Sequence, residues 1–310
     1  MPPWTSANVP NLAGRSAIVT GSNSGLGFET AKQLALHGAS VTLAVRDRVK
    51  GEQAATTMRS SNPDQDIHVG QLDVSDLESV REFADTWSRE HPDGLDLLIN
   101  NAGIMATPRR ESAQGFEMQL ATNHLGHFAL TGLLFPALVA VSNSRVVTVS
   151  SLAHRMVSGF NFDDPMSEKK YRAWRAYGQS KLANLLFTTE FSRRLELGDY
   201  SVGAVAAHPG FTATNLQGVA SKMRGNSLEF HVTAFVNRII ARGPDMGALP
   251  ILFAATAPGL ANDSYIGPAD KWQTRGYPTL VARNGAAHDA LQARRLWDWS
   301  EEITGVTYPF

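Results

Sequence analysis

Short apolar segments alternate with amphipathic stretches along most of the chain, and this alternation constrains the fold more than any other feature. We expect the buried strands at residues 16–19, 41–45, 67–69, 95–99, 146–149, 202–206 and 265–266. Helical patterns lie between them at residues 28–37, 49–58, 75–87 and 247–257. Strands that alternate with helices form βαβ units and a parallel sheet. The sequence therefore predicts an α/β fold, with a doubly wound parallel sheet and helices on both faces.

We interpret residues 1–310 as one domain, because no repeat, low-complexity linker or change of composition divides them. Residues 158–172 form an irregular polar stretch. Residues 216–245 carry glycines and apolar side chains without a strand pattern. This combination predicts a helical lid over the open end of the sheet, where a ligand would bind.

Charge and composition exclude several classes of partner. The formal net charge is −1 and the 28 basic residues are spread along the chain, so neither nucleic acid nor an anionic membrane is expected. No apolar run reaches the roughly 18–20 residues of a membrane-spanning helix. The chain has no cysteine, which excludes disulfides, thiolate zinc sites and cysteine nucleophiles and favours a cytoplasmic location. A homo-oligomer is left open.

A glycine-rich turn separates the first strand from the first helix. It has the pattern T-G-x-x-x-G-x-G, made by Thr20, Gly21, Ser22, Asn23, Ser24, Gly25, Leu26 and Gly27. Glycines permit a tight turn and bring the backbone close to a pyrophosphate, which then rests on the N–H groups of the helix N-terminus. The spacing is one residue longer than the G-x-G-x-x-G fingerprint. The turn therefore predicts a dinucleotide site.

Tyr177 and Lys181 lie four residues apart in a helical stretch, so their side chains share one face. A phenol is a useful acid or base only when its pKa, about 10 in water, is lowered. An ammonium group at about 4 Å favours the phenolate by up to roughly 4 kcal/mol at an effective dielectric constant of about 20. The pair is therefore a candidate proton-transfer group, with the pKa of Tyr177 expected to be lowered. Ser151, which follows a strand, would hydrogen-bond the substrate oxygen.

His124 and His127 are three residues apart in a helical stretch and raise the question of a metal site. No carboxylate and no third histidine accompanies them. We interpret both as packing or polar core contacts, and we expect no metal.

These motifs occur in the order found in the short-chain dehydrogenase/reductase family, which the chain resembles from about residue 12 to 267. The set comprises residues 20–27, 100–103, Asn123, Ser151, Tyr177 with Lys181, and Pro209 with Gly210. Residues 45–47, 123–128 and 149–154 resemble the retinol-dehydrogenase-like branch. The resemblance implies a Rossmann-type fold and hydride transfer with a nicotinamide cofactor.

The resemblance also implies roles for particular residues. Asn123 would order a water that links Lys181 to solvent, and Ser151 takes precedence over Ser150 because the family serine is the second of the pair. The remaining residues would contact the cofactor: Asp73 and Val74 at the adenine, Asn101, Ala102 and Gly103 in the segment that flanks it, Thr212 at the nicotinamide amide, and also Pro209, Gly210, Tyr177 and Lys181.

Arg46 follows the second strand, where a carboxylate would accept a hydrogen bond from the ribose of NAD. A guanidinium there can bind the 2′-phosphate of NADP with two hydrogen bonds. Asp47 is the counter-argument, but it lies one residue past the strand end. We therefore expect NADP(H) to be favoured over NAD(H).

Several aromatic and apolar residues follow the sixth strand, namely Phe211, Met223, Phe230 and Phe235. A parallel sheet opens its ligand crevice at this end, which predicts a small hydrophobic ketone, aldehyde or alcohol as substrate. Two alternatives stay open. One is reduction of a C=C bond, as in the protochlorophyllide reductases, although their distinctive cysteine is absent. The other is a non-catalytic NADP-binding sensor.

Overall fold

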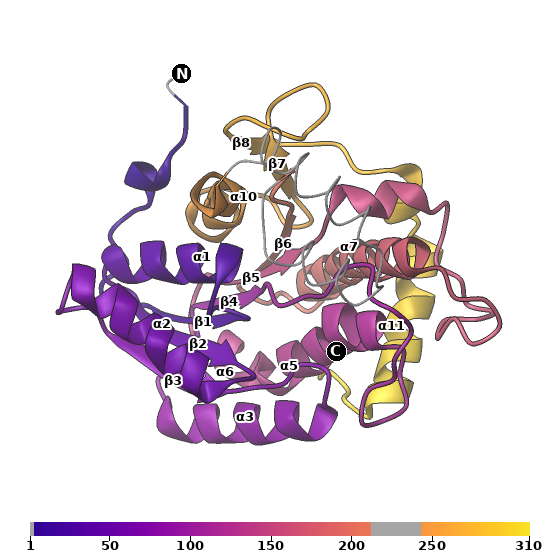
Figure 1. The fold of residues 1–310 in the computed structure, drawn as a ribbon, viewed down its shortest axis with the longest axis horizontal. Coiled ribbons are helices and arrows are strands. Elements are labelled where there is room, and N and C mark those ends of the chain that lie inside the picture. The colour runs from indigo at the N-terminus through magenta and orange to yellow at the C-terminus, as the bar shows by residue number, and fades with distance from the viewer. Residues whose placement is uncertain (1–2, 212–242) are drawn as a thin grey trace.

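The computed structural model describes residues 3–211 and 243–310, whose strands form one eight-stranded sheet in the order β3-β2-β1-β4-β5-β6-β7-β8 (Figure 1). The strands are β1 Ser16–Thr20, β2 Ser40–Val45, β3 Ile67–Gln71, β4 Leu97–Asn100, β5 Ser144–Val149, β6 Val202–Ala207, β7 Tyr265–Pro268 and β8 Pro278–Leu280. All neighbours pair in parallel except β8, which is antiparallel to β7. This confirms the predicted doubly wound parallel sheet.

Helices cover both faces of the sheet, as the sequence predicts. One face packs against α1 Gly25–Leu36, α2 Arg48–Ser61 and α10 Pro244–Thr256. The other packs against α3 Leu77–Glu90, α5 Gly126–Leu133, α6 Phe135–Val139 and α7 Ala173–Leu197. Figure 1 shows α1 and α10 side by side on one side of the strands, with α5 and α7 on the other.

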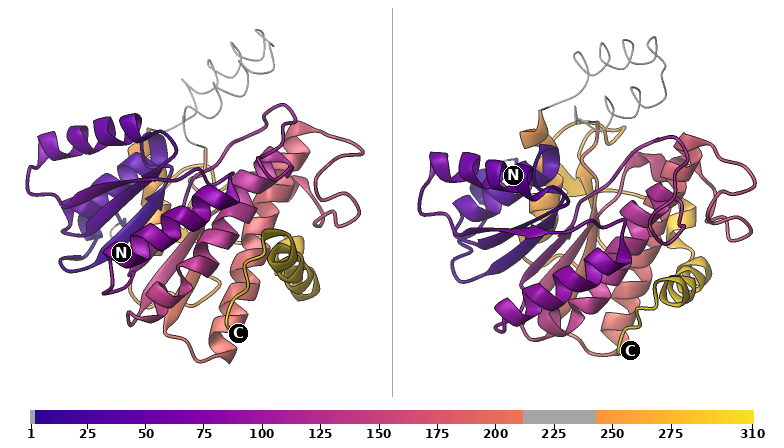
Figure 2. Two further views of the ribbon diagram at one scale, coloured as in Figure 1. Left: turned by 90° about the horizontal axis from the view of Figure 1, so that it is seen from below. Right: turned by 60° about the horizontal axis from the view of Figure 1, so that its bottom comes forward.

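Two C-terminal elements lie beyond the strands and helices that the sequence patterns predict. Strand β8 extends the sheet past β7, and α11 Ala290–Thr304 packs along α7 (Figure 2). Trp297 of α11 is buried and stacks on Phe187 and Phe191 of α7, at ring-centroid distances of 5.7 and 5.9 Å. Trp297 is thus a packing residue, as expected.

The order of the sheet reverses between β1 and β4, because β1 leads on one side to β2 and β3 and on the other side to β4 and β5. In open α/β sheets, ligands bind beyond the carboxyl ends of the strands at such a switch point. The glycine-rich turn follows β1, and Asn101-Ala102-Gly103 follows β4. The topology therefore brings these two predicted cofactor segments together.

The helical stretch that holds His124 and His127 is divided into three parts. α4 Met118–Leu120 passes into a π-helical turn, Ala121–Leu125, and then into α5. In the π-turn the Gly126 N–H donates to the carbonyl of Ala121. A Cβ on Gly126 would lie 1.7 Å from the carbonyl oxygen of Val74, so glycine is required where this helix passes the segment after β3.

The helix predicted at residues 75–87 begins two residues later, at Leu77. Asp76 caps α3 by accepting a 3.1 Å hydrogen bond from the Glu78 N–H. The Ser75 hydroxyl instead donates to Asp73 at 2.6 Å. The predicted lid, residues 216–245, lies almost entirely outside the described residues, and the division into one domain stays a prediction.

Candidate active site

At each position of the turn after β1 that holds a glycine, the backbone or its surroundings explain why glycine is there. Gly21 has φ +65°, and a Cβ there would lie 3.0 Å from Ala102. A Cβ on Gly27 would lie 2.5 Å from the Gly21 oxygen and 2.6 Å from Asn101 Nδ2. Gly25 has φ +60° and open space where its Cβ would stand. Gly21 and Gly27 thus permit close packing, whereas Gly25 leaves the turn open to an approaching group.

The start of α1 has the form expected of an anion site. Its N-cap residue, Ser24, makes no side-chain capping bond to the first N–H groups of the helix. The Ser22 hydroxyl points inward and donates to the Val19 carbonyl at 2.8 Å, while Leu26 packs against the core and Asn23 is half-buried. These residues fit a bound pyrophosphate on the helix N-terminus.

The Thr20 hydroxyl joins the turn after β1 to the segment after β4. It accepts 2.9 Å hydrogen bonds from the backbone N–H groups of Asn101 and Ala102. The Asn101 side chain donates back to the Thr20 carbonyl at 2.7 Å. The same hydroxyl lies 2.9 Å from Nε2 of buried His127. The two predicted cofactor segments are therefore one hydrogen-bonded unit.

Arg46 and Asp47 occupy different surroundings at the end of β2. The Arg46 side chain is 76% exposed, and its Nε lies 4.0 Å from Asp73, close to the predicted adenine contacts Asp73 and Val74. Asp47 caps α2, where it accepts from the Lys50 N–H at 3.2 Å and pairs with the Lys50 ammonium at 3.2 Å. These bonds lower the pKa of Asp47.

The Asn123 side chain holds the segment that follows Gly103 by hydrogen bonds. Its Oδ1 accepts from the Ile104 N–H at 2.8 Å, and its Nδ2 donates to the Ile104 carbonyl at 3.0 Å and to Ser180 Oγ at 2.8 Å. A Cβ on Gly103 would lie 3.1 Å from Asn123 Oδ1 and 3.5 Å from Lys181 Nζ. Gly103 therefore lies directly beside both predicted catalytic side chains.

Tyr177 and Lys181 come from the first turns of α7 and lie beside the end of β5. Tyr177 is 7% exposed and Lys181 is 4% exposed. Lys181 Nζ donates to the Val149 carbonyl at 3.0 Å and lies 5.8 Å from the centre of the Tyr177 ring. Asn184 donates to the same Val149 carbonyl at 3.0 Å, which fixes the lysine against the strand end.

The two serines after β5 point in different directions. Ser150 is buried, and its hydroxyl donates to the Lys181 carbonyl at 2.8 Å. Ser151 is half-buried, accepts from the Ala153 N–H at 3.2 Å and hydrogen-bonds with Tyr177. This geometry supports the choice of Ser151 as the residue that faces a substrate.

The expected direction of the Tyr177 pKa is wrong. Burial raises the pKa of Tyr177, and the hydrogen bond with Ser151 opposes that change. Burial also lowers the pKa of Lys181 to about 8. The physical reason is that desolvation penalises the charged form of each group, whereas the sequence argument considered only their mutual attraction.

Pro209 and Gly210 form the turn after β6. Gly210 has φ +71°, and a Cβ there would lie 2.5 Å from the Thr274 carbonyl oxygen. The Gly210 N–H donates to His208 Nδ1 at 3.2 Å, and the Phe211 N–H donates to the Thr274 carbonyl at 3.0 Å. Phe211 is half-buried. Thr212 and the predicted apolar residues Met223, Phe230 and Phe235 lie outside the described residues.

Three residues near the site were missed as functional by the sequence argument. His127 was assigned to the core, Thr20 counted only as the start of a motif, and Trp174 was not considered. Trp174 is 42% exposed, and its ring lies edge-on to the Tyr177 ring at 6.2 Å. The available signal was spacing, since Trp174 precedes Tyr177 by three residues and His127 follows Asn123 by four.

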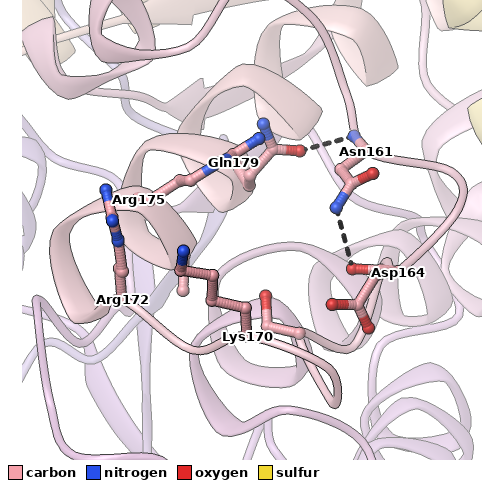
Figure 3. Close-up of a pocket in the computed structure, with 8 residues that line it drawn as sticks. Asn161, Asp164, Lys170, Arg172, Arg175 and Gln179 are labelled. Atoms are coloured by element: carbon pink, nitrogen blue, oxygen red, sulfur yellow. Dashed lines mark hydrogen bonds between the residues drawn. The ribbon is translucent and has the colours of Figure 1, made fainter.

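A small polar hollow of about 60 Å³ lies on the other side of α7 (Figure 3). It is lined by Asn161, Asp164, Ser167, Lys170, Arg172, Arg175, Ala176 and Gln179. At 3.6 residues per turn, Arg172, Arg175 and Gln179 face away from Tyr177 and Lys181. The hollow is therefore separate from the candidate active site.

Within residues 3–211 and 243–310, no group of three or more histidine, aspartate and glutamate side chains could hold a metal ion. Over the same part of the chain, no helix combines the length and apolar character needed to cross a membrane.

The fold and the order of these motifs agree with comparisons to known proteins. A model of the family described as short chain dehydrogenase matches residues 15–225, so the chain belongs to this family of oxidoreductases. Human retinol dehydrogenase 13 is 38% identical over 301 residues, which cover 96% of this chain and 87% of that protein. Mouse retinol dehydrogenase 11 is 40% identical, over a match that covers 95% of this chain and 88% of that protein.

Solved structures agree with the fold. An uncharacterized protein from Mycobacterium Paratuberculosis is 43% identical, with a TM-score of 0.82 and complete coverage of both chains. A short chain dehydrogenase from Shigella flexneri complexed with NADP has a TM-score of 0.59 and 22% identity, over 80% of this chain and 94% of that one. The named relatives place this chain in the retinol-dehydrogenase-like branch, and its reaction class is the interconversion of alcohols and carbonyls.

Proposed function

We propose that the protein is an NADP(H)-dependent oxidoreductase that interconverts a hydrophobic ketone or aldehyde and its alcohol, with Tyr177 as the acid and base. The observation that carries the proposal is the grouping of Ser151, Tyr177 and Lys181 beside Gly103. This grouping lies at the carboxyl end of β5, one strand from the switch point of the sheet. A dinucleotide bound on the glycine turn would reach this position from the switch point.

A bound nicotinamide supplies or accepts the hydride. In the reducing direction, the Tyr177 hydroxyl donates its proton to the carbonyl oxygen, and the Ser151 hydroxyl hydrogen-bonds the same oxygen. Burial keeps the phenol protonated at neutral pH because it raises the pKa of Tyr177. Lys181, with a water that Asn123 would order, then carries the replacement proton from solvent to Tyr177.

Arg46 supports the preference for NADP(H). Its guanidinium is exposed at the end of β2, beside Asp73, where the 2′-phosphate would lie. Asp47 is the residue that would favour NAD(H), but its carboxylate is already bound to the Lys50 N–H and ammonium. A ribose hydroxyl would have to compete with both of these contacts.

The hydrophobic substrate is inferred from two side chains and from the relatives. Trp174 is exposed beside Tyr177, and Phe211 follows the Pro209-Gly210 turn. Trp174 thus presents aromatic surface beside the candidate catalytic group, and Phe211 lies past the carboxyl end of β6, the strand next to β5. Retinol, named in the curated relatives, is a large apolar alcohol. A location in the cytoplasm, favoured by the absence of cysteine, is part of the same proposal.

The test is a panel of ketones, aldehydes and enones, in which oxidation of NADPH and of NADH is followed for each compound. We expect turnover with apolar ketones or aldehydes and NADPH, with the alcohol as product. Turnover of enones alone, with a saturated ketone as product, would replace the proposal with C=C reduction. Tight NADPH binding without turnover of any compound would replace it with a cofactor sensor.

A further inference from the structure

His127 lies in the first turn of α5 with both ring nitrogens in contact with the candidate active site. Its side chain is almost fully buried, with 2% of the residue exposed. Nε2 lies 2.9 Å from the Thr20 hydroxyl, and Nδ1 lies 3.2 Å from the Asn123 carbonyl oxygen. One imidazole therefore spans from the turn after β1 to the π-turn that carries Asn123.

The hydrogen bonds around Thr20 select one tautomer of His127. The Thr20 oxygen already accepts two N–H groups, from Asn101 and Ala102, so its own proton is free to be donated. The His127 Nε2 lies nearer than the Ile99 carbonyl, at 2.9 Å against 3.3 Å. Nε2 is then the acceptor, and Nδ1 carries the proton that it donates to the Asn123 carbonyl.

This assignment requires a neutral ring, because an imidazolium has no acceptor for the Thr20 proton. The surroundings agree, since burial lowers the pKa of His127 to about 4. The Asn123 carbonyl, which accepts from Nδ1, opposes this change, and Lys181 lowers the pKa further. The ring thus stays neutral at physiological pH.

The two contacts of His127 connect the predicted cofactor segments to the segment beside the candidate catalytic residues. Thr20 holds Asn101 and Ala102, which belong to the predicted cofactor contacts. Asn123 holds Ile104, beside Gly103 and Lys181. We propose that His127 is a positioning residue that fixes the cofactor turn through Nε2 and the Asn123 segment through Nδ1. The inference rests on the proposed oxidoreductase function.

Three variants separate the two contacts. In His127→Gln the side-chain amide reaches the position of Nε2, and in His127→Asn it reaches the position of Nδ1. His127→Leu removes both contacts and keeps an apolar side chain in the core. For each variant we would measure the NADPH dissociation constant by fluorescence, kcat at saturating cofactor, and the unfolding midpoint.

The inference predicts that cofactor affinity follows the Thr20 contact and that kcat follows the Asn123 contact. His127→Leu should bind NADPH about tenfold more weakly, which corresponds to the cost of an unpaired buried polar group. His127→Gln should restore most of the affinity but not kcat, and His127→Asn should restore most of kcat but not the affinity. Equal losses in all three variants, or no loss in any, would overturn the inference.

His124 provides the matched control. It is equally buried and three residues away, but its Nε2 lies 3.0 Å from Ser300 of α11, far along the chain from the cofactor segments. His124→Gln, His124→Asn and His124→Leu should change the unfolding midpoint without changing cofactor affinity. Losses of affinity equal to those of the His127 set would show that any buried substitution in this helix has the same effect.

Nitrogen NMR of histidine in the unsubstituted protein gives a readout that does not depend on turnover. We expect a neutral His127 with the proton on Nδ1, and a proton on Nε2 would overturn the assignment. If the substrate panel shows no turnover, the proposed function fails. The NMR signal and the NADPH affinities would still decide whether His127 holds the two segments.

Discussion

The two faces of α7 carry cations in opposite surroundings. On the inner face, the Lys181 ammonium is buried against β5 and donates to the Val149 carbonyl. On the outer face, Lys170, Arg172 and Arg175 surround the polar hollow and are exposed to solvent. Burial lowers the pKa of the Lys181 ammonium to about 8. The difference teaches that desolvation by the sheet, rather than the number of charges, makes a cation useful for proton transfer.

Removal of the inner cation should have the larger effect. Lys181→Met keeps the length of the side chain and removes the ammonium, so kcat should fall by about 10²–10⁴ and cofactor binding should weaken. Steady-state kinetics and NADPH binding measure the two effects separately. A variant with weaker binding but an unchanged kcat at saturation would limit Lys181 to holding the cofactor.

Arg46 is a third kind of cation, because its side chain is exposed but lies where a phosphate would bind. Arg46→Asp should reduce the preference for NADPH over NADH by about 10²-fold, because charged hydrogen bonds of about 1.5–3 kcal/mol are replaced by repulsion. The matched control is Arg48→Asp, two residues on, where the side chain pairs with Glu52 at 3.8 Å. That change should leave the preference nearly intact. An unmodified enzyme that prefers NADH would assign the ribose contact to Asp47.

Burial also predicts how stability depends on pH. The folded pKa values of His127 and His154 are lowered to about 4, and that of His208 to about 3, from 6.5. A lowered folded pKa means that the unfolded chain binds protons first as the pH falls. The free energy of unfolding should therefore keep its full value above about pH 6.5. Below that pH it should decrease, by about 1 kcal/mol for each of these histidines at pH 5.5.

Urea unfolding at pH 7.5 and at pH 5.5 would measure this loss. A free energy of unfolding that stays constant from pH 7.5 to 5.5 would mean that the buried histidines are charged or accessible.

The smallest effect is expected on the outer face of α7. Arg172→Gln with Arg175→Gln should leave kcat and NADPH affinity within about twofold, and stability within about 0.5 kcal/mol, as for exposed positions elsewhere. The same assays used for the Lys181 variant measure this. A tenfold loss of activity would break the comparison and connect the hollow of Figure 3 to the reaction.

Sequence patterns predicted the parts of the molecule that local rules determine. The alternation of strands and helices was sufficient for the seven parallel strands, and the glycine spacing located the turn after β1. The antiparallel β8 is too short to show a pattern, and the burial of α11 depends on α7, which is far away in the chain.

For the candidate active site, too, local sequence patterns predicted only what a single element determines. Spacing on one helix brought Tyr177 and Lys181 to one face, because that depends on the helix alone. The direction of the Tyr177 pKa was wrong, because the cost of burial is set by the sheet and helices around it. The role of His127 was missed for a related reason, since Thr20 and Asn123 meet the ring only in the folded chain.

The most direct test of the central claim is transfer of deuterium from 4-deuterated NADPH to a hydrophobic aldehyde in a single turnover. We predict that the label reaches the alcohol carbon in the unsubstituted protein. In Tyr177→Phe, which keeps the ring and removes the proton donor, transfer should be slower by about 10² or more while NADPH still binds. Transfer within a few-fold of the unsubstituted rate would contradict the assignment of Tyr177 as the acid.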